Sequence, residues 1–226
     1  MVMPIQSVTK HDIPEIAARA LEGLLDSSGT FLYSSHQTIR PGDIYFLGLN
    51  PGGCGGPSLR ERLDKILSQE ENAYLDEAWE NEAGSYMPGQ APLQKRVAWL
   101  LGNLGVDPRE VFSSNLIFMQ SRDASGVSIE HANKCWPVHE ALLSIVRPRL
   151  ILTFGNSSFS PYGYIHALYG GTQRYAWSGH GNWSLKGFNT QMPWGEVFVA
   201  GIPHLSRYCP VGKQDVVDWI RNEGRA

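Results

Sequence analysis

Cysteine, charge and long apolar runs are all scarce in this chain of 226 residues. The three cysteines, Cys54, Cys135 and Cys209, are odd in number and far apart, which disfavours a disulfide framework and favours a reducing, cytoplasmic environment. Three thiols are also too few for the four ligands of an iron–sulfur cluster. We expect no metal and no other cofactor.

No apolar run approaches the ~20 residues that a membrane-spanning helix requires. Lys10, His11, Asp12 and Glu15 interrupt the apolar core that a signal peptide would need, so we expect no membrane contact. The formal net charge is −3, which disfavours a strong, non-specific nucleic-acid binder but permits a locally basic cleft. Hydrophobic residues make up 42% of the chain, which indicates a folded protein.

Short apolar runs alternate with helical patterns along the chain. At ~150 residues per domain, the length favours one domain over residues 1–226, which we expect to be monomeric. Strands are predicted at 44–49, 111–118, 150–154 and 197–202. Helices are predicted at 11–26, 58–82, 92–104, 129–146, 157–169 and 212–222. This alternation predicts a three-layer α/β/α fold with a central, mainly parallel, four-stranded sheet. The Gly- and Trp-rich segment 170–195 receives no assignment.

Three of the predicted strands end in polar residues of interest: Asn50 and His204 come after their strands, and Asn115 is an amide on an otherwise apolar strand. Ligands of parallel α/β sheets bind beyond the carboxyl ends of the strands, so we expect these three side chains to share one crevice. The turn at 50–57 is rich in glycine and can bind phosphate through backbone N–H groups. It lacks the Lys-Ser/Thr ending of a P-loop.

These residues resemble the motifs of the uracil-DNA glycosylase superfamily. Gly-Leu-Asn-Pro-Gly at 48–52 is similar to the first motif, and most closely to that of the mismatch-specific and single-strand-selective branches. His-Leu-Ser at 204–206 is similar to the second motif, His-Pro-Ser, with Leu205 in place of proline. The strand that ends at Asn115 resembles the one whose asparagine reads the base edge. The resemblance covers roughly residues 40–210.

The resemblance implies a monofunctional DNA repair glycosylase that flips uracil or a related deaminated base out of DNA and hydrolyses its N-glycosidic bond. Asn50 would then position the attacking water, although a neutral amide is a poor general base and predicts slow turnover. His204 would donate a hydrogen bond to the base carbonyl oxygen as negative charge develops there. Asn115, which can donate and accept, would match the O4 and N3–H edge of uracil and reject cytosine.

The resemblance also assigns the walls of the base pocket. Gly48 and Leu49 precede the water-positioning residue and belong to the substrate-binding set. Gly52 stands where the most uracil-restricted branch has a bulky tyrosine, so a wider range of bases is expected. Tyr86 falls where the family places the aromatic ring that stacks on the flipped base.

Contacts to the DNA backbone and stack are implied for four further residues. Gly53 and Ser206 are candidates to bind phosphates through a backbone amide and a hydroxyl. Arg207 and Tyr208 are candidates to fill the gap that the flipped base leaves. DNA is therefore the expected partner.

Two other functions remain open at this point. Asn50 and Leu205 depart from the most active pattern, which fits a non-catalytic module that binds nucleic acid or a nucleobase on the same fold. A small-molecule hydrolase or phosphate-binding protein that uses the glycine-rich turn is the other alternative.

The spacing of cysteine and histidine offers two other candidate sites. Cys54 and His204 could form a nucleophilic dyad if both lie at strand ends, but no third residue orients them. His131, Cys135 and His139 follow one another at intervals of four on a predicted helix. Its outer members would lie ~12 Å apart, too far for one metal ion to bind all three.

Overall fold

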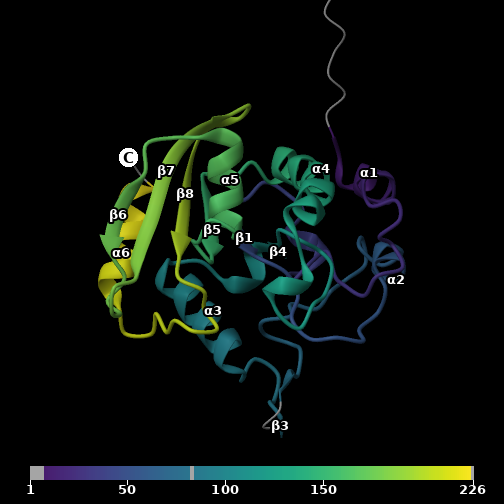
Figure 1. The fold of residues 1–226 in the computed structure, drawn as a ribbon, viewed down its shortest axis with the longest axis horizontal. Coiled ribbons are helices and arrows are strands. Elements are labelled where there is room, and N and C mark those ends of the chain that lie inside the picture. Colours follow the sequence, from purple (N-terminus) through teal and green to yellow (C-terminus); the bar gives the residue numbers. More distant parts are fainter. Residues whose placement is uncertain (1–7, 82–83, 225–226) are drawn as a thin grey trace, which may run out of the picture.

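Six strands form the central sheet of the computed structural model, which describes residues 8–81 and 84–224 (Figure 1). Four neighbouring strands are parallel and lie in the order β4 (Phe112–Asn115), β1 (Ile44–Gly48), β5 (Leu150–Phe154) and β8 (Gly195–Ile202). They are the four strands predicted from apolar runs, and the prediction of a mixed α/β fold with a mainly parallel sheet is confirmed.

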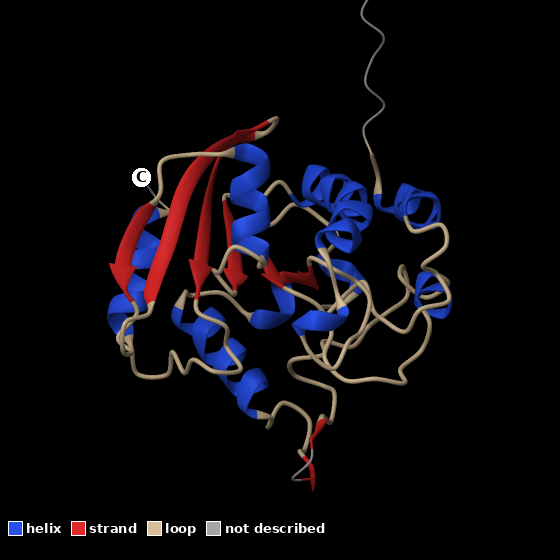
Figure 2. Ribbon diagram, viewed as in Figure 1, coloured by secondary structure: helices blue, strands red, loops and turns tan. Residues whose placement is uncertain are grey.

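The expected number of strands is wrong because the segment 170–195 extends the sheet. Two antiparallel strands, β7 (Ser184–Met192) and β6 (Arg174–Trp177), follow β8, so that β6 forms the edge of the sheet (Figure 2). Gly187 of β7 is required by packing, since a Cβ there would lie 2.4 Å from Cζ of Phe198. A separate two-stranded sheet contains β2 (Glu80–Asn81) and β3 (Gly84–Ser85).

Helices cover both faces of the sheet, because successive strand residues point to opposite sides. In β1, Tyr45 and Leu47 join one core cluster, whereas Ile44 and Phe46 join the other. The first cluster lies beneath α1 (Ile13–Ala20), α4 (Ile129–Val146) and α5 (Pro161–Tyr169). The second lies beneath α3 (Pro92–Asn103) and α6 (Gln214–Glu223).

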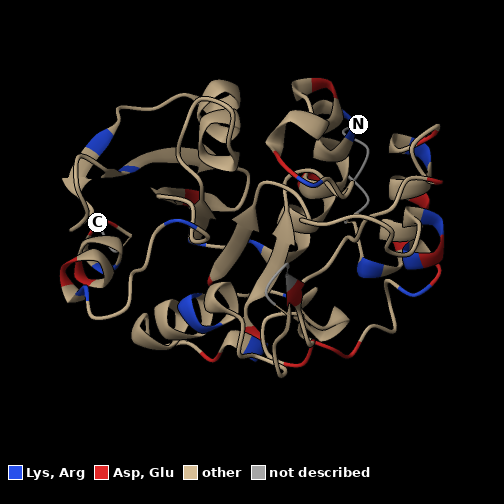
Figure 3. Cartoon of the chain, turned by 60° about the horizontal axis from the view of Figure 1, so that its bottom comes forward, with Lys and Arg blue, Asp and Glu red and all other residues tan. Residues whose placement is uncertain are grey.

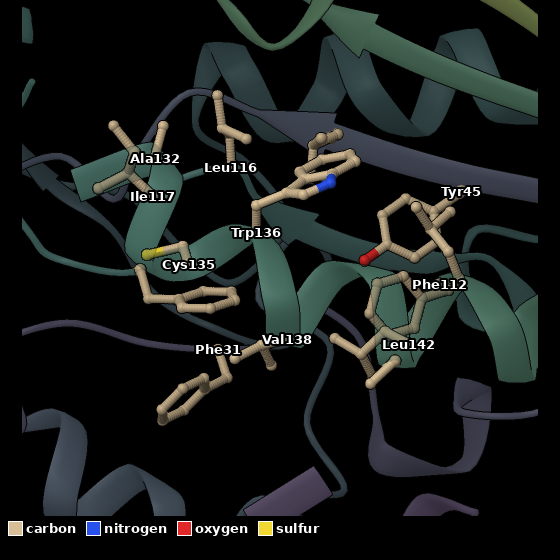
Figure 4. Packing of buried hydrophobic residues seen from close by; sticks show 14 of the residues in the cluster. Phe31, Tyr45, Phe112, Leu116, Ile117, Ala132, Cys135, Trp136, Val138 and Leu142 are labelled. Atoms are coloured by element: carbon tan, nitrogen blue, oxygen red, sulfur yellow. The ribbon is translucent and has the colours of Figure 1, made fainter. Parts of the chain in front are cut away.

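Helix α4 makes the densest contact with the first cluster. Figure 4 shows Leu142 of this helix beside the aromatic rings of Tyr45 and Phe112, and Val138 on the side of Phe31. The rings of Tyr45 and Phe112 are stacked, with centroids 4.4 Å apart. The helix therefore fixes β1 and β4, the two strands from which two of the candidate site residues follow.

The predicted helix at 58–82 is wrong beyond its first turn, where α2 (Leu59–Leu63) ends. Polar side chains fix an irregular path there instead: the amide of Gln69 donates to the carbonyls of Leu32 and Ser34, at 3.2 and 3.1 Å. The amide of Asn72 donates to the carbonyl of Pro108 at 3.1 Å. These hydrogen bonds reach distant segments, so a local pattern does not reveal them.

The first predicted helix is also shorter than expected, since α1 ends at Ala20 and Gly23 adopts a positive φ of 81°. The remaining helical elements are single 3₁₀ turns: η1 (Lys10–Asp12), η2 (His36–Thr38), η3 (Pro108–Glu110) and η4 (Ala124–Gly126). In the described ranges, none of the helices has the length and apolar character needed to cross a membrane.

Candidate functional site

A cleft of about 1180 Å³ opens at the carboxyl ends of the parallel strands, which point downward in Figure 1. Each of the four parallel strands contributes the segment that follows it. Lining residues lie within 49–57 after β1, 115–124 at the end of β4, 154–160 at the end of β5 and 203–207 after β8. Further lining residues lie within 29–33, 73–80 and 182–186, and at positions 62 and 93. Asn50, Asn115 and His204 all line this cleft, as the convergence of the strand ends predicted.

The side chain of Asn50 is held in one orientation. Its Nδ2 donates to the carbonyl of Pro51 at 2.9 Å and to Oγ of Ser121 at 2.8 Å. Ser121 is itself anchored, since its hydroxyl donates to the carbonyl of Asp123 at 2.5 Å. Both amide hydrogens of Asn50 are thus used, and Oδ1 is left as an acceptor that can orient a water molecule.

Asn115 is 2% exposed, and its buried Nδ2 has no acceptor in hydrogen-bonding geometry among the described residues. A polar group nearby is the buried hydroxyl of Tyr33, which also lines the cleft, and Asn115 opposes the rise that burial causes in the pKa of that hydroxyl. The absence of a side chain at Gly48 makes room for Asn115. A Cβ on Gly48 would lie 2.2 Å from Oδ1 of Asn115 and 2.5 Å from Cζ of Phe154. Gly48 therefore shapes the closed end of the cleft without lining it. A buried, unpaired donor costs ~1–3 kcal/mol, so a ligand oxygen at this place would recover that free energy.

Three of the five fully buried, unpartnered side-chain atoms in residues 8–81 and 84–224 belong to residues that line this one cleft. They are Nδ2 of Asn115, the hydroxyl of Tyr74 and Nε of Arg62. Burial raises the pKa of Tyr74 well above its usual range, so its hydroxyl stays protonated. All three groups can therefore donate, and the cleft suits a ligand that is rich in hydrogen-bond acceptors.

His204 presents a defined nitrogen to the cleft. The backbone N–H of Ser206 donates to its Nδ1 at 3.2 Å, and the hydroxyl of Ser206 lies 2.7 Å from the same atom. Because Nδ1 accepts, the neutral ring carries its proton on Nε2. Burial, assisted by the nearby charge of Arg207, lowers the pKa of His204 and favours this neutral form.

The loop that carries His204 is anchored without the proline of the resembling motif. Leu205 is fully buried in the second core cluster. Arg96 of α3 donates to the carbonyls of Leu205 and Ser206, at 2.6 and 2.9 Å. The ring of His204 also packs edge-on against Phe154, with centroids 5.4 Å apart. Leucine in this position is thus compatible with a fixed histidine.

The glycine-rich turn forms another wall and is fastened by one side chain. Gln120 donates to the carbonyl of Gly52 at 2.7 Å and accepts from the N–H of Gly56 at 3.2 Å. Gly53 adopts a positive φ of 92°, a conformation that favours glycine. Gly52 and Gly53 are exposed in the lining, and Leu49 lines the cleft beside them.

The aromatic walls differ from those expected. Tyr86 does not line the cleft, so the structure does not bring it together with Asn115. The rings that do line it include those of Tyr33, Tyr74, Trp79 and Phe154. Phe154 ends β5, and its position at a strand end was the signal that could have identified it. Trp79 lies in the stretch wrongly predicted as helix.

Of the residues expected to contact DNA, Ser206 and Arg207 are exposed and line the cleft, whereas Tyr208 does not. Tyr208 is fully buried, and its hydroxyl donates to the carbonyl of Ser178 at 2.6 Å. The expectation that Tyr208 fills the gap in a base stack is therefore corrected: its ring is part of the core.

Charges of both signs surround the opening, as Figure 3 shows for this end of the molecule. The basic lining residues are Arg62, Arg122, Lys186 and Arg207. The acidic lining residues are Glu77, Glu80 and Asp123. The lining thus has four basic and three acidic side chains, a slight basic excess in a chain whose net charge is −3.

The alternative sites find less support in the geometry. Cys54 and His204 both line the cleft, but no hydrogen bond joins them in the part of the chain that the structure describes. Cys135 and His139 are fully buried. Across the described ranges, no group of three or more His, Cys, Asp and Glu side chains is arranged to hold a metal ion.

Comparison with known proteins assigns neither a family nor a function to the chain. No model of a known protein family matches the chain, and no curated protein matches it.

Proposed function

We propose that the protein is a monofunctional DNA glycosylase that removes uracil or a related deaminated base. The observation that carries this proposal is the unpaired amide nitrogen of Asn115, buried in a cleft with aromatic walls. A flat base that is rich in acceptors would stack on the aromatic walls and accept a hydrogen bond from this amide. In uracil, O4 would accept from Nδ2 of Asn115 and N3–H would donate to Oδ1.

The proposed reaction is hydrolysis of the bond between N1 of the base and C1′ of the sugar. As the bond breaks, its electron pair stays on the base and positive charge develops on the sugar. The Nε2–H of His204 would donate to the O2 oxygen of the departing anion. Oδ1 of Asn50 would accept a hydrogen bond from the water that adds to C1′, and the water's second proton is released to solvent.

Cleavage of a labelled oligonucleotide panel tests the proposal. The panel holds uracil, hypoxanthine, xanthine or thymine, in single strands and opposite each base, and alkali reveals abasic sites. We expect abasic product from at least one deaminated base, with the activity lost in Asn50→Ala. Intact oligonucleotides throughout, at high enzyme concentration, would overturn it.

A second candidate is a module that binds the base without cleaving it. The amide of Asn50 favours it, since this group cannot remove a proton from water as a carboxylate would. This candidate predicts tight binding of a uracil-containing oligonucleotide with no abasic product. The same panel, read by binding as well as by cleavage, separates the two functions.

A further inference from the structure

Two large aromatic side chains are unusually exposed on the edge strand β6. Trp177 is 69% exposed and Tyr175 is 62% exposed, more than any other aromatic residue that the structure describes. Exposed aromatic rings that are close neighbours mark a binding surface more often than isolated ones do. Figure 1 shows that β6 lies at the outer edge of the sheet, beyond β7.

The two rings share a face of the sheet with residues of the cleft. In the antiparallel ladder, Tyr175 pairs with Lys186 and Trp177 pairs with Ser184. Paired residues project to the same face, with Cβ atoms ~4.5–5.5 Å apart. Lys186 and Ser184 both line the cleft. The aromatic pair is therefore one strand away from the cleft wall and continues its surface.

Hydrogen bonds hold both rings in place. The indole N–H of Trp177 donates to the carbonyl of Gly181 at 3.0 Å, and the hydroxyl of Tyr175 donates to Oε1 of Gln173. The polar atom of each ring is satisfied within the protein, so what remains for a partner is the apolar ring face. Rings that are oriented before binding lose little conformational entropy when a partner stacks on them.

A third ring and a cation connect the pair to the cleft. Trp183, in the turn between β6 and β7, is 38% exposed and lines the cleft. Nζ of Lys186 is held by the carbonyl of Asn156 at 2.8 Å and lies on the same wall. Aromatic faces that alternate with a cation match unpaired bases on a phosphate backbone. The bases of a duplex are already stacked on both sides and offer no such face.

We propose that the β6–β7 hairpin is a stacking platform for unpaired bases of the strand that continues from the target base in the cleft. This inference rests on the proposed function for the identity of the target base. The platform itself binds bases of any sequence, because every base has a face that can stack.

Fluorescence anisotropy with labelled, uracil-free oligonucleotides tests the platform independently of catalysis. A single strand of mixed sequence and the corresponding duplex are titrated with wild type, Trp177→Ala, Tyr175→Ala and Trp177→Phe at one salt concentration. Tyr169→Ala is the matched control, since Tyr169 is an aromatic residue of α5 that is 36% exposed and does not line the cleft. Circular dichroism confirms that each variant is folded.

We expect Trp177→Ala to weaken single-strand binding about ten-fold, the loss of one stacked base, and Tyr175→Ala to weaken it several-fold. Trp177→Phe keeps a ring and should retain most of the affinity, and Tyr169→Ala should bind as wild type does. Equal affinities for all variants, or equal losses for duplex and single strand, would overturn the platform. So would a wild-type dimer that becomes monomeric in Trp177→Ala, because the hairpin would then cover a second copy. Failure of the oligonucleotide panel to be cleaved would leave these binding results unaffected.

Discussion

Two groups of buried polar side chains flank the turn after β4, and they differ in whether their hydrogen bonds are complete. The first group lies in the core between β1 and α4. Nε2 of His139 donates to the carbonyl of Leu116 at 3.1 Å, and its Nδ1 accepts from the hydroxyl of Tyr45 at 2.8 Å. This group has no polar side-chain atom left without a partner.

The second group lies in the cleft and is incomplete. Asn115 is adjacent in sequence to Leu116, but its Nδ2 has no partner, and the same holds for atoms of Tyr74 and Arg62. Asn115 and Tyr74 are as buried as His139 and Tyr45, so burial alone does not separate a structural polar residue from a functional one. Completeness of the hydrogen bonds does separate the two kinds of residue, because a buried donor without an acceptor is costly unless a ligand supplies one. We therefore expect substitutions in the cleft to change rates, and those in the core group to change stability.

The largest effect is expected for Asn50→Ala. Loss of the acceptor that orients the water should lower the single-turnover cleavage rate by about 10²–10⁴, while binding of the uracil-containing strand is largely retained. Ser121→Ala serves as a control, since it removes only one of the two bonds that orient Asn50 and should cost less. Wild-type cleavage by Asn50→Ala would reject this role.

A smaller loss is expected for His204→Ala. Removing one donor to the departing base should lower the cleavage rate by about one to three decades. Ser206→Ala is the matched variant, because the backbone N–H at 206 still donates to Nδ1 and keeps the proton on Nε2. Equal rates for His204→Ala and wild type would show that His204 does not touch the base.

The core group predicts a pH dependence of stability. Burial lowers the pKa of His139 from 6.5 to about 4, so the unfolded chain binds a proton between these values and the folded protein does not. The free energy of unfolding should therefore fall as the pH falls from 6.5 to 4, by up to about 3 kcal/mol.

Urea denaturation of wild type and His139→Gln between pH 7 and pH 4 measures how much His139 contributes to the pH dependence of the free energy of unfolding. Glutamine can donate and accept but does not titrate, so the variant should lose the part of the pH dependence that His139 contributes. An identical pH profile in both proteins would mean that His139 is not the group responsible.

The sequence predicts the part of the fold that is buried on both faces. The sequences of β1, β5 and β8 are almost wholly apolar, with Thr153 and Glu196 as the polar exceptions, and this pattern makes the three strands recognisable. Strand β7 contains Gly187, Asn189 and Gln191, because part of it faces solvent and a glycine makes way for Phe198. Its pattern therefore resembles a loop until its partner strand is known.

The residues of the candidate site that lie at the ends of the predicted strands were predictable from the sequence, and the others were not. Asn115 ends its strand, and Asn50 and His204 come shortly after theirs. The carboxyl ends of neighbouring parallel strands lie at the same edge of the sheet. Tyr74 was missed because it lies beyond α2, where hydrogen bonds to distant backbone groups fix the path of the chain. Arg62 lies in α2 itself, and its place in the cleft depends on tertiary packing that the local pattern does not show. Tyr208 follows the motif closely, but its orientation depends on Ser178 in another segment.

The most direct test of the central claim is the cleavage rate of Asn115→Ala on a uracil-containing single strand, measured on protein shown to be folded. Because Nδ2 of Asn115 has no acceptor in hydrogen-bonding geometry and is itself costly to bury, its removal should not lower the free energy of unfolding by more than about 1 kcal/mol. Loss of two hydrogen bonds to the base should lower cleavage about 100-fold. A folded variant that cleaves as wild type does would contradict the account, because the unpaired amide would then have no part in binding the base.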